Sequence, residues 1–339
     1  MNQRKLLAFL IGALAVLAAA ALVTLTAMKL LQFRNETKTQ IEAAEASAPN
    51  KIQPVLLDPG AFELDGVRYT PKKRVMSYLI LGMDRTQEQL DRGMNAQADV
   101  LLLVVLDGES QTYQILQINR DTETLVTILN PDDQITDSVF MPVCLAQGFG
   151  STEQVCCENT VRAVRYLLSD VEIDGYFALN LNAIEAINDA VGGVTVKIDS
   201  DMTSVNPDFV KGATVTLDQS NVEVYVRSRM SLGDDNNMNR LKRQRTYLSA
   251  WLAKASDLAG KDPGFLLELL DKIKAFSVTD LTDKRLSNMA STMDQYENLG
   301  FVTIEGENIQ GLSYNEFYAD SESIRQVLLT LFYTAETIE

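Results

Sequence analysis

The chain has 339 residues, 46% of them hydrophobic, and carries 30 Lys and Arg against 46 Asp and Glu, for a formal net charge of -16. This size allows one large domain or two small ones. The acidic balance argues against a general affinity for nucleic acid or an anionic membrane surface, because both need a basic footprint. The chain has no His, which excludes Ser-His-Asp and Cys-His nucleophile machinery.

The first predicted element is an apolar segment from Leu6 to Met28 that contains no charged residue. A helix of this length crosses the hydrocarbon core of a bilayer. A secretory signal has an apolar region of only about 7 to 15 residues and a cleavage signature, which this segment lacks. We therefore expect residues 1–34 to form a short tail and a transmembrane anchor.

Residues 35–70 are rich in Glu, Thr, Ala and Ser and include Pro54 and Pro59, a composition typical of a stalk or linker. We assign residues 71–339 to one globular domain. No second apolar segment of similar length follows, so this domain should lie wholly on one side of the membrane.

Strands and helices are predicted to alternate through the domain. Residues 75–84 read as a strand, and residues 98–107 are apolar almost without alternation, as in a strand buried on both faces. Residues 158–170 have helical spacing, and residues 176–199 predict strand, helix, Gly-Gly turn and strand. Helical patterns recur at residues 263–274, 283–298 and 321–337. The fold class is therefore α/β with a buried central sheet.

Basic residues gather between Tyr225 and Leu248. We predict a strand over residues 222–229, in which Arg227 and Arg229 share one face. The next segment predicts a helix with Arg240, Gln244 and Tyr247 on one face, at i, i+4 and i+7.

The end of this strand and the start of this helix would face one pocket. The forked guanidinium groups of arginines there suit the oxygens of a pyrophosphate. A solvated, salt-bridged surface is the alternative interpretation of the same charges.

Acidic residues stand at predicted strand ends: Asp84 follows one strand, Asp99 opens the next, and Arg120 and Asp121 close a third. Ligand crevices form at such strand ends in open α/β sheets. Neighbouring carboxylates there would suit Mg²⁺, which prefers carboxylate and phosphate oxygens. Each Asp also fits a role as a turn or cap residue.

The three cysteines, Cys144, Cys156 and Cys157, are too few for a zinc site in a chain without His. A disulfide between Cys144 and either Cys156 or Cys157, with Cys157 as the candidate partner, would suit an oxidising exterior. Reduced, buried thiols are the alternative.

Six segments occur in the order and spacing of LytR-CpsA-Psr proteins: "LILGMDR", "QADVLLLVVLD", "INRDTETLV", "INDAVGGVTVKID", "YVRSR" and "NRLKRQR". The resemblance runs from about Val75 to Tyr333, behind one N-terminal membrane span. It implies an α-β-α sandwich with a central mixed sheet, lying extracytoplasmically on a single-pass anchor in the cell membrane.

The implied activity is that of a phosphotransferase. It moves a glycopolymer, such as wall teichoic acid or capsular polysaccharide, from a polyprenyl-pyrophosphate carrier to peptidoglycan, with Mg²⁺ or Mn²⁺. A hydrophobic pocket is expected for the polyprenyl chain and an arginine-lined mouth for its phosphates. Alternatives are a polyprenyl-phosphate-binding pyrophosphatase and a non-catalytic envelope sensor or scaffold.

The resemblance also assigns site residues. The metal carboxylates are Asp84 and Asp99, and the catalytic residues are Arg120 and a base among Asp99, Asp234 and Asp235. The pyrophosphate contacts are Arg85, Arg120, Arg227, Arg229, Arg240 and Gln244.

Three positions depart from the family pattern. Many members have Arg-Ser-Asp where this chain has Gln97-Ala98-Asp99, many have Asp at the position of Asn237, and Pro is frequent at the position of Asn119. With these departures we still expect a phosphate-binding site, but the general base is unassigned.

Overall fold

The computed structural model describes residues 60–228, 237–310 and 315–337. The predicted anchor at Leu6–Met28 lies outside these ranges, as do the site candidates Arg229, Asp234 and Asp235. Within the described ranges, no helix combines the length and the apolar character that a membrane span requires.

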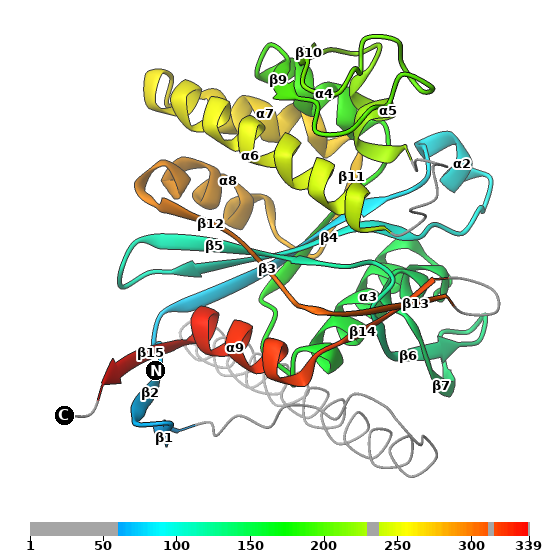
Figure 1. The fold of residues 1–339 in the computed structure, drawn as a ribbon. Helices are drawn as coiled ribbons and strands as arrows, with labels where there is room; N and C mark the ends of the chain where they lie inside the picture. The colour runs from blue at the N-terminus through cyan, green and yellow to red at the C-terminus, as the bar shows by residue number, and fades with distance from the viewer. Residues whose placement is uncertain (1–59, 229–236, 311–314, 338–339) are drawn as a thin grey trace, which may run out of the picture. The chain divides into compact units, whose positions relative to one another are not determined.

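A mixed sheet forms the centre of the fold, and among the described residues it has six strands (Figure 1). Their order is β11 (Ser277–Thr279), β8 (Gly175–Leu179), β3 (Val75–Met83), β4 (Ala98–Asp107), β5 (Thr112–Ile118) and β12 (Glu297–Thr303). β3 pairs antiparallel with β4 and parallel with β8, and β12 runs parallel to β5. The predicted α/β class with a buried central sheet is confirmed.

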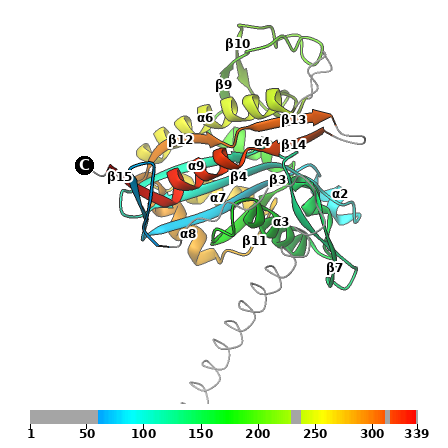
Figure 2. The same cartoon turned by 60° about the horizontal axis from the view of Figure 1, so that its bottom comes forward.

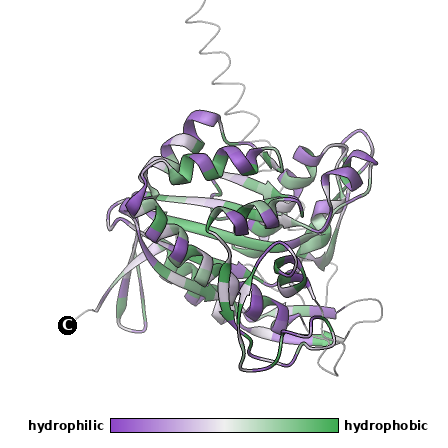
Figure 3. Cartoon of the chain, turned by 90° about the horizontal axis from the view of Figure 1, so that it is seen from above, coloured by the Kyte–Doolittle hydropathy of each residue, from purple (hydrophilic) through white to green (hydrophobic). Residues whose placement is uncertain are grey.

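Helices cover both faces of this sheet because successive strand residues point to opposite sides. In β3, Leu79 and Leu81 enter one core with α3 (Glu153–Leu167) and α9 (Ser321–Phe332), whereas Tyr78 enters another with α7 (Phe265–Lys274) and α8 (Asp283–Thr292). In Figure 2, α9 lies in front of the central strands. Figure 3 shows apolar strands between helices whose outer sides are polar.

Smaller sheets surround the centre. They are the hairpins β6 (Glu123–Leu129) with β7 (Ile135–Pro142), β9 (Val194–Lys197) with β10 (Thr214–Leu217), and β13 (Gly306–Gln310) with β14 (Asn315–Ala319). The remaining helices of the described ranges include α2 (Gln87–Asp91), α4 (Ala183–Ala190) and the 3-10 turns η1 (Val143–Gly148) and η2 (Met293–Gln295). The strand, helix, Gly-Gly turn and strand predicted over residues 176–199 are therefore present as β8, α4 and β9.

The folded unit begins earlier than the predicted boundary at residue 71. Residues 62–70, which the sequence assigned to the stalk, contribute β1 (Phe62–Leu64) and most of β2 (Val67–Pro71). β2 pairs with β15 (Tyr333–Thr337), and the ring of Phe62 packs against Tyr69 and Tyr333. Contacts between the two ends of the domain, which no local pattern reveals, place this segment in the fold.

The predicted strand at residues 222–229 is wrong, because residues Val222–Arg227 form helix α5. Its buried residues Val222, Tyr225 and Val226 follow helical spacing and enter an apolar cluster with β9, β10 and α6 (Met238–Lys261). Tertiary burial overrides the strand preference of β-branched residues. Arg227 therefore lies in a helix, and Arg229 lies outside the described residues.

Candidate functional site

Two neighbouring cavities lie where β3 and β4 meet α5 and α6. The polar cavity has a volume of about 370 Å³ and is lined by Asp84, Gln97, Asp99, Arg120, Glu223, Val224, Arg227, Ser228 and Arg240. The apolar pocket beside it has a volume of about 160 Å³. Both are lined by Asp99 and Arg227, so these two residues mark the boundary between them.

Asp99 lies between two buried arginines at the start of β4. Nη1 of Arg120 forms an ion pair with Oδ1 of Asp99, and Nη1 of Arg240 donates to Oδ2 at 3.1 Å. Arg120 also donates to Oε1 of Gln97 and Oδ1 of Asp121. Two guanidinium groups therefore meet at one carboxylate, and forked arginines of this kind suit an anionic ligand.

Asn237 orients Arg240 at the first turn of α6. Its Oδ1 accepts a hydrogen bond of 2.8 Å from Nε of Arg240, and its Nδ2 donates at 2.8 Å to Oδ1 of Asn119. Asn237 is the N-cap residue of α6, but its side chain makes no capping bond. Two of the departures from the family pattern, Asn119 and Asn237, are therefore direct partners in the wall of the site.

Asp84 closes the loop between β3 and β4. Its Oδ1 accepts from the backbone N–H of Gln97 at 2.7 Å, and its Oδ2 lies 2.6 Å from Nη1 of Arg85. Gly82, two residues earlier, lies at a register shift between β3 and β4, where an added Cβ would come within 2.9 Å of Val100. The position of Asp84 at the end of β3 thus depends on the close approach of β3 to β4 at Gly82.

Arg227 stands at the C-terminal end of α5, which α6 holds in place. Nε and Nη2 of the fully buried Arg243 donate to the carbonyl oxygens of Tyr225 and Ser228. Nη1 of Arg227 lies 2.5 Å from Oε1 of Glu223, one helical turn earlier. Arg243 therefore anchors α5 by donating to carbonyl oxygens at the C-terminal end of that helix, which have no partner within it. This contact fixes the position from which Arg227 enters the site.

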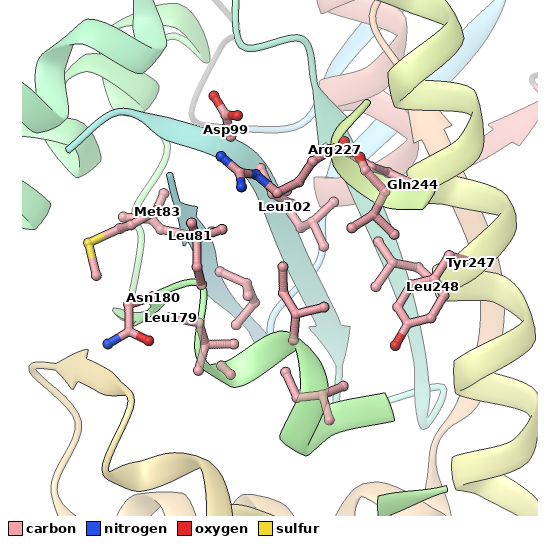
Figure 4. A pocket seen from close by; sticks show the side chains of 18 residues that line it. Leu81, Met83, Asp99, Leu102, Leu179, Asn180, Arg227, Gln244, Tyr247 and Leu248 are labelled. Atoms are coloured by element: carbon pink, nitrogen blue, oxygen red, sulfur yellow. Dashed lines mark hydrogen bonds between the residues drawn. The ribbon is translucent and has the colours of Figure 1, made fainter. Parts of the chain in front are cut away.

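Apolar side chains from six elements, β8 and α5 among them, line the second pocket. β3, β4, α4 and α6 contribute residues that include Ile80, Leu102, Ile184, Ile187, Tyr247 and Leu248. Figure 4 shows Arg227 and Asp99 together at one end of this pocket, away from Leu248. A ligand that fills both cavities would need a hydrocarbon part and an anionic part.

The structure sorts the predicted site residues into three groups. Asp84, Asp99, Arg120, Arg227 and Arg240 line the polar cavity together. Gln244 instead lines the apolar pocket, where its Nε2 donates to the carbonyl of Val226 at 3.3 Å. Arg85 pairs with Asp84 and does not line the polar cavity. The predicted shared face of Arg240, Gln244 and Tyr247 on α6 is correct, and all three are buried.

Four residues of the polar cavity, Gln97, Glu223, Val224 and Ser228, were not predicted from the sequence, and two of them make side-chain contacts with arginines of the site. Gln97 was noted only as a departure, yet it accepts a hydrogen bond from Arg120 and closes the Asp84 loop. Glu223 was assigned no role, yet it lines the polar cavity. The spacing of Glu223 and Arg227, four residues apart, is the signal for their pairing on one helix face.

Asp84 and Asp99 are the cavity carboxylates that would hold a magnesium ion together with a phosphate ligand. Mg²⁺ usually takes one or two carboxylates and completes its octahedron with phosphate oxygens and water. Both Asp residues line the same cavity, although Arg120 and Arg240 already contact Asp99. In the described ranges no group of three or more His, Cys, Asp or Glu residues would bind a metal by itself.

The cysteines are free thiols, so the predicted disulfide between Cys144 and Cys157 is not formed in the structure. Cys144 lies in η1, and its backbone N–H donates to the carbonyl of Arg120. Cys157, in α3, accepts a hydrogen bond from Nε2 of Gln147 at 3.3 Å. Burial raises the pKa of Cys144 to about 11 and that of Cys157 to about 12, which keeps both thiols protonated.

A polar, arginine-lined cavity beside an apolar pocket, at the strand ends of a mixed sheet, is the kind of site that suits an amphipathic anion. The chain belongs to the LytR_cpsA_psr family, whose model matches residues 27–331. The predicted family is therefore confirmed.

Curated relatives and solved structures agree with this assignment. The polyisoprenyl-teichoic acid–peptidoglycan teichoic acid transferase TagU of Bacillus anthracis is 27% identical over 262 residues, which cover 76% of this chain and 78% of the relative. The crystal structure of B. subtilis TagV has a TM-score of 0.57 at 20% identity, covering 77% of this chain and 96% of TagV. TagT bound to LI-WTA has a TM-score of 0.56 at 22% identity, covering 80% and 92%. These structures share the fold.

Proposed function

We propose that this protein transfers an anionic glycopolymer, such as wall teichoic acid or capsular polysaccharide, from a polyprenyl-pyrophosphate carrier to peptidoglycan. The observation that carries the proposal is that Asp99 and Arg227 line both the polar cavity and the apolar pocket. A polyprenyl tail suits the apolar pocket, and a pyrophosphate suits the arginine-lined cavity. The name of the TagU relative, a teichoic acid transferase, supports the same reaction class.

The reaction is a phosphoryl transfer. A hydroxyl of peptidoglycan attacks the sugar-linked phosphorus, and polyprenyl phosphate leaves with the bridging oxygen. Such transfers depend mainly on positioning and on neutralising the phosphate charge. Arg120, Arg227 and Arg240 line the cavity from three elements and are suited to bind the phosphate oxygens.

Asp84 and Asp99 are the residues that would hold Mg²⁺, or Mn²⁺ in its place. The ion would neutralise charge on the phosphate oxygens when bound. Asp99 has a second role that needs no metal, because it orients Arg120 and Arg240 toward the cavity.

An anchor at Leu6–Met28 would attach the domain to the extracytoplasmic face of the cell membrane. A lipid-linked donor is confined to that membrane, and peptidoglycan lies outside it. The anchor and its stalk would therefore hold the catalytic domain within reach of both substrates.

The full chain in detergent provides the test, with a radiolabelled farnesyl-pyrophosphate-linked disaccharide as donor and purified peptidoglycan as acceptor. Wild type should move label into peptidoglycan. Arg227→Gln should lower kcat by about 100-fold or more, since it removes one cationic donor from the transition state. Arg92→Gln is the matched control, because Arg92 is an exposed helical arginine paired with Glu88.

Two outcomes would contradict transfer. Label released as soluble sugar phosphate at the same rate with and without peptidoglycan would indicate a hydrolase. Retention of the prenyl lipid without any turnover would indicate a binding or scaffold protein.

A further inference from the structure

Glu223 is a carboxylate of the polar cavity with no role in the site as described above. It lines the cavity with Asp84 and Asp99 and belongs to α5. Because Glu223 and Arg227 are four residues apart, their side chains share one face of this helix. Oε1 of Glu223 lies 2.5 Å from Nη1 of Arg227.

The three cavity carboxylates differ in how many donors they already accept. Both oxygens of Asp99 face arginines, and both oxygens of Asp84 accept from Arg85 or from the backbone of Gln97. Their side chains are only 16% and 15% exposed. Glu223 is 41% exposed, and Arg227 is its one ionic partner among the described residues.

A carboxylate accepts a proton most readily when few fixed donors compete for its lone pairs. Access matters too, since a general base must come within hydrogen-bond reach of the acceptor hydroxyl. Glu223 meets both conditions better than Asp84 or Asp99. Those two are held by neighbours that orient the site.

Binding of the lipid-linked substrate could free Glu223 from its ion pair with Arg227. Arg227 lines both cavities, so it stands where the head group of an amphipathic ligand meets the tail. A pyrophosphate offers Arg227 a stronger, bidentate partner than one carboxylate oxygen. Donor binding would then draw the guanidinium from Glu223 to the phosphate and leave the carboxylate next to the reacting phosphorus.

We propose that Glu223 is the general base of the reaction, an inference that rests on the proposed transferase function. An oxygen of the Glu223 carboxylate takes the proton of the peptidoglycan hydroxyl. At the same time, the hydroxyl oxygen forms a bond to the sugar-linked phosphorus. The bond from this phosphorus to the bridging oxygen breaks, and the electron pair leaves with polyprenyl phosphate. Glu223 then returns its proton to solvent.

A merely structural Glu223 would act only by holding Arg227. Glu88 and Arg92 form the same kind of pair on α2, with the same 2.5 Å separation, outside both cavities. Glu88→Gln is therefore the matched control for loss of a helical Glu–Arg pair.

The test uses the full chain, the farnesyl-pyrophosphate-linked disaccharide and peptidoglycan described above. Glu223→Gln keeps a side-chain oxygen that accepts from Arg227 but is not a base. We expect its kcat to fall by about 100-fold or more while KM for the donor and retention of the prenyl lipid stay within twofold of wild type. Added formate should raise kcat of Glu223→Ala by at least about tenfold, because formate supplies a mobile carboxylate. Glu88→Gln should behave as wild type.

Three results would overturn the assignment. Wild-type kcat in Glu223→Gln would exclude Glu223 as the base and leave the transferase function intact. A fall in lipid retention that accounts for the lost rate, without rescue by formate, would make Glu223 a positioning residue for Arg227. Absence of transfer by the wild-type chain would overturn the proposed function and this inference with it.

Discussion

At the residue scale, a pair of asparagines separated by 118 positions joins two parts of the site. Asn119 ends the segment that leads to Arg120, and Asn237 begins the helix that carries Arg240. Their side-chain hydrogen bond links the segment that carries Arg120 to the helix that carries Arg240, and both arginines contact Asp99. An Asp at position 237 would accept from Arg240 but could not donate to Asn119 when ionised.

The Asn237 bridge leads to a graded prediction. Asn237→Ala removes the acceptor of Nε of Arg240 and the donor to Asn119, and such losses at a buried site cost about 1–3 kcal/mol. We expect kcat for transfer to fall by about 5- to 150-fold, the equivalent of that energy. Asn237→Asp should lose less, because it keeps the acceptor for Arg240. Equal rates for Asn237→Ala and wild type in the radiolabel assay would contradict the role of the bridge.

At the element scale, the helical conformation of α5 changes which side chains share a face with Arg227. In a strand, Arg227 and Arg229 would have pointed the same way. In the helix, Arg227 instead shares a face with Glu223, and Arg243 from α6 holds the helix end. Helix α5 therefore brings one carboxylate, Glu223, and one guanidinium, Arg227, to the same wall of the polar cavity.

β3 and β4 approach one another closely at Gly82, and this contact predicts a stability effect. A Cβ at Gly82 would lie 2.9 Å from Cβ of Val100, so Gly82→Ala must shift one of the two strands. We expect a loss of about 1–3 kcal/mol in the free energy of unfolding, measured in urea, as for other overpacked cores.

Gly260 provides the control for this substitution. It lies in α6 with nothing within 4 Å of an added Cβ. Gly260→Ala should be neutral or stabilising by up to about 1 kcal/mol, since Ala favours helices. A Gly82→Ala variant as stable as Gly260→Ala would show that the strands adjust freely at this point.

At the scale of the whole molecule, an acidic chain brings three of its arginines together in one cavity. The net charge is -16, yet Arg120, Arg227 and Arg240 meet in one cavity. Outside that cavity, the prevailing negative charge would repel an anionic polymer after transfer. Binding and release of the same kind of ligand thus depend on how charge is distributed over the fold.

Stability of the whole domain should fall at alkaline pH. The pKa of Cys144 is raised to about 11 and that of Cys157 to about 12, from an ordinary value of 9.0, mainly by burial. The folded state therefore holds protons that the unfolded state loses above pH 9. This contribution to stability is complete below pH 9 and is lost as pH rises through about 11 and 12.

Urea unfolding at pH 8 and pH 10 measures this loss. Each thiol should remove about 1.4 kcal/mol per pH unit above 9. A Cys144→Ala, Cys157→Ala double variant should lose less stability over the same interval, whatever its stability at pH 8. Identical losses in the two proteins would show that the thiols do not contribute. Wild-type protein unfolded without reductant should titrate as three free thiols, whereas a disulfide would leave one.

Much of the fold follows from local patterns. The apolar run of β4 predicts a strand buried on both faces, and the i, i+4 and i+7 positions of Arg240, Gln244 and Tyr247 predict one face of α6. The helical pattern predicted over residues 283–298 was right for α8 but missed β12, whose pairing with the distant β5 decides its conformation. The pattern over residues 321–337 likewise missed β15, which pairs with β2.

The sequence by itself determined the α/β class, the resemblance to the family and most of the arginines and carboxylates of the site. These features depend on residue type and on short spacings, which a single segment carries. Only the tertiary structure decided that α5 is a helix, that Asn119 bonds to Asn237, and that Glu223 joins the polar cavity. Each of these depends on burial against segments far away in the chain, and that energy is absent until the chain has folded.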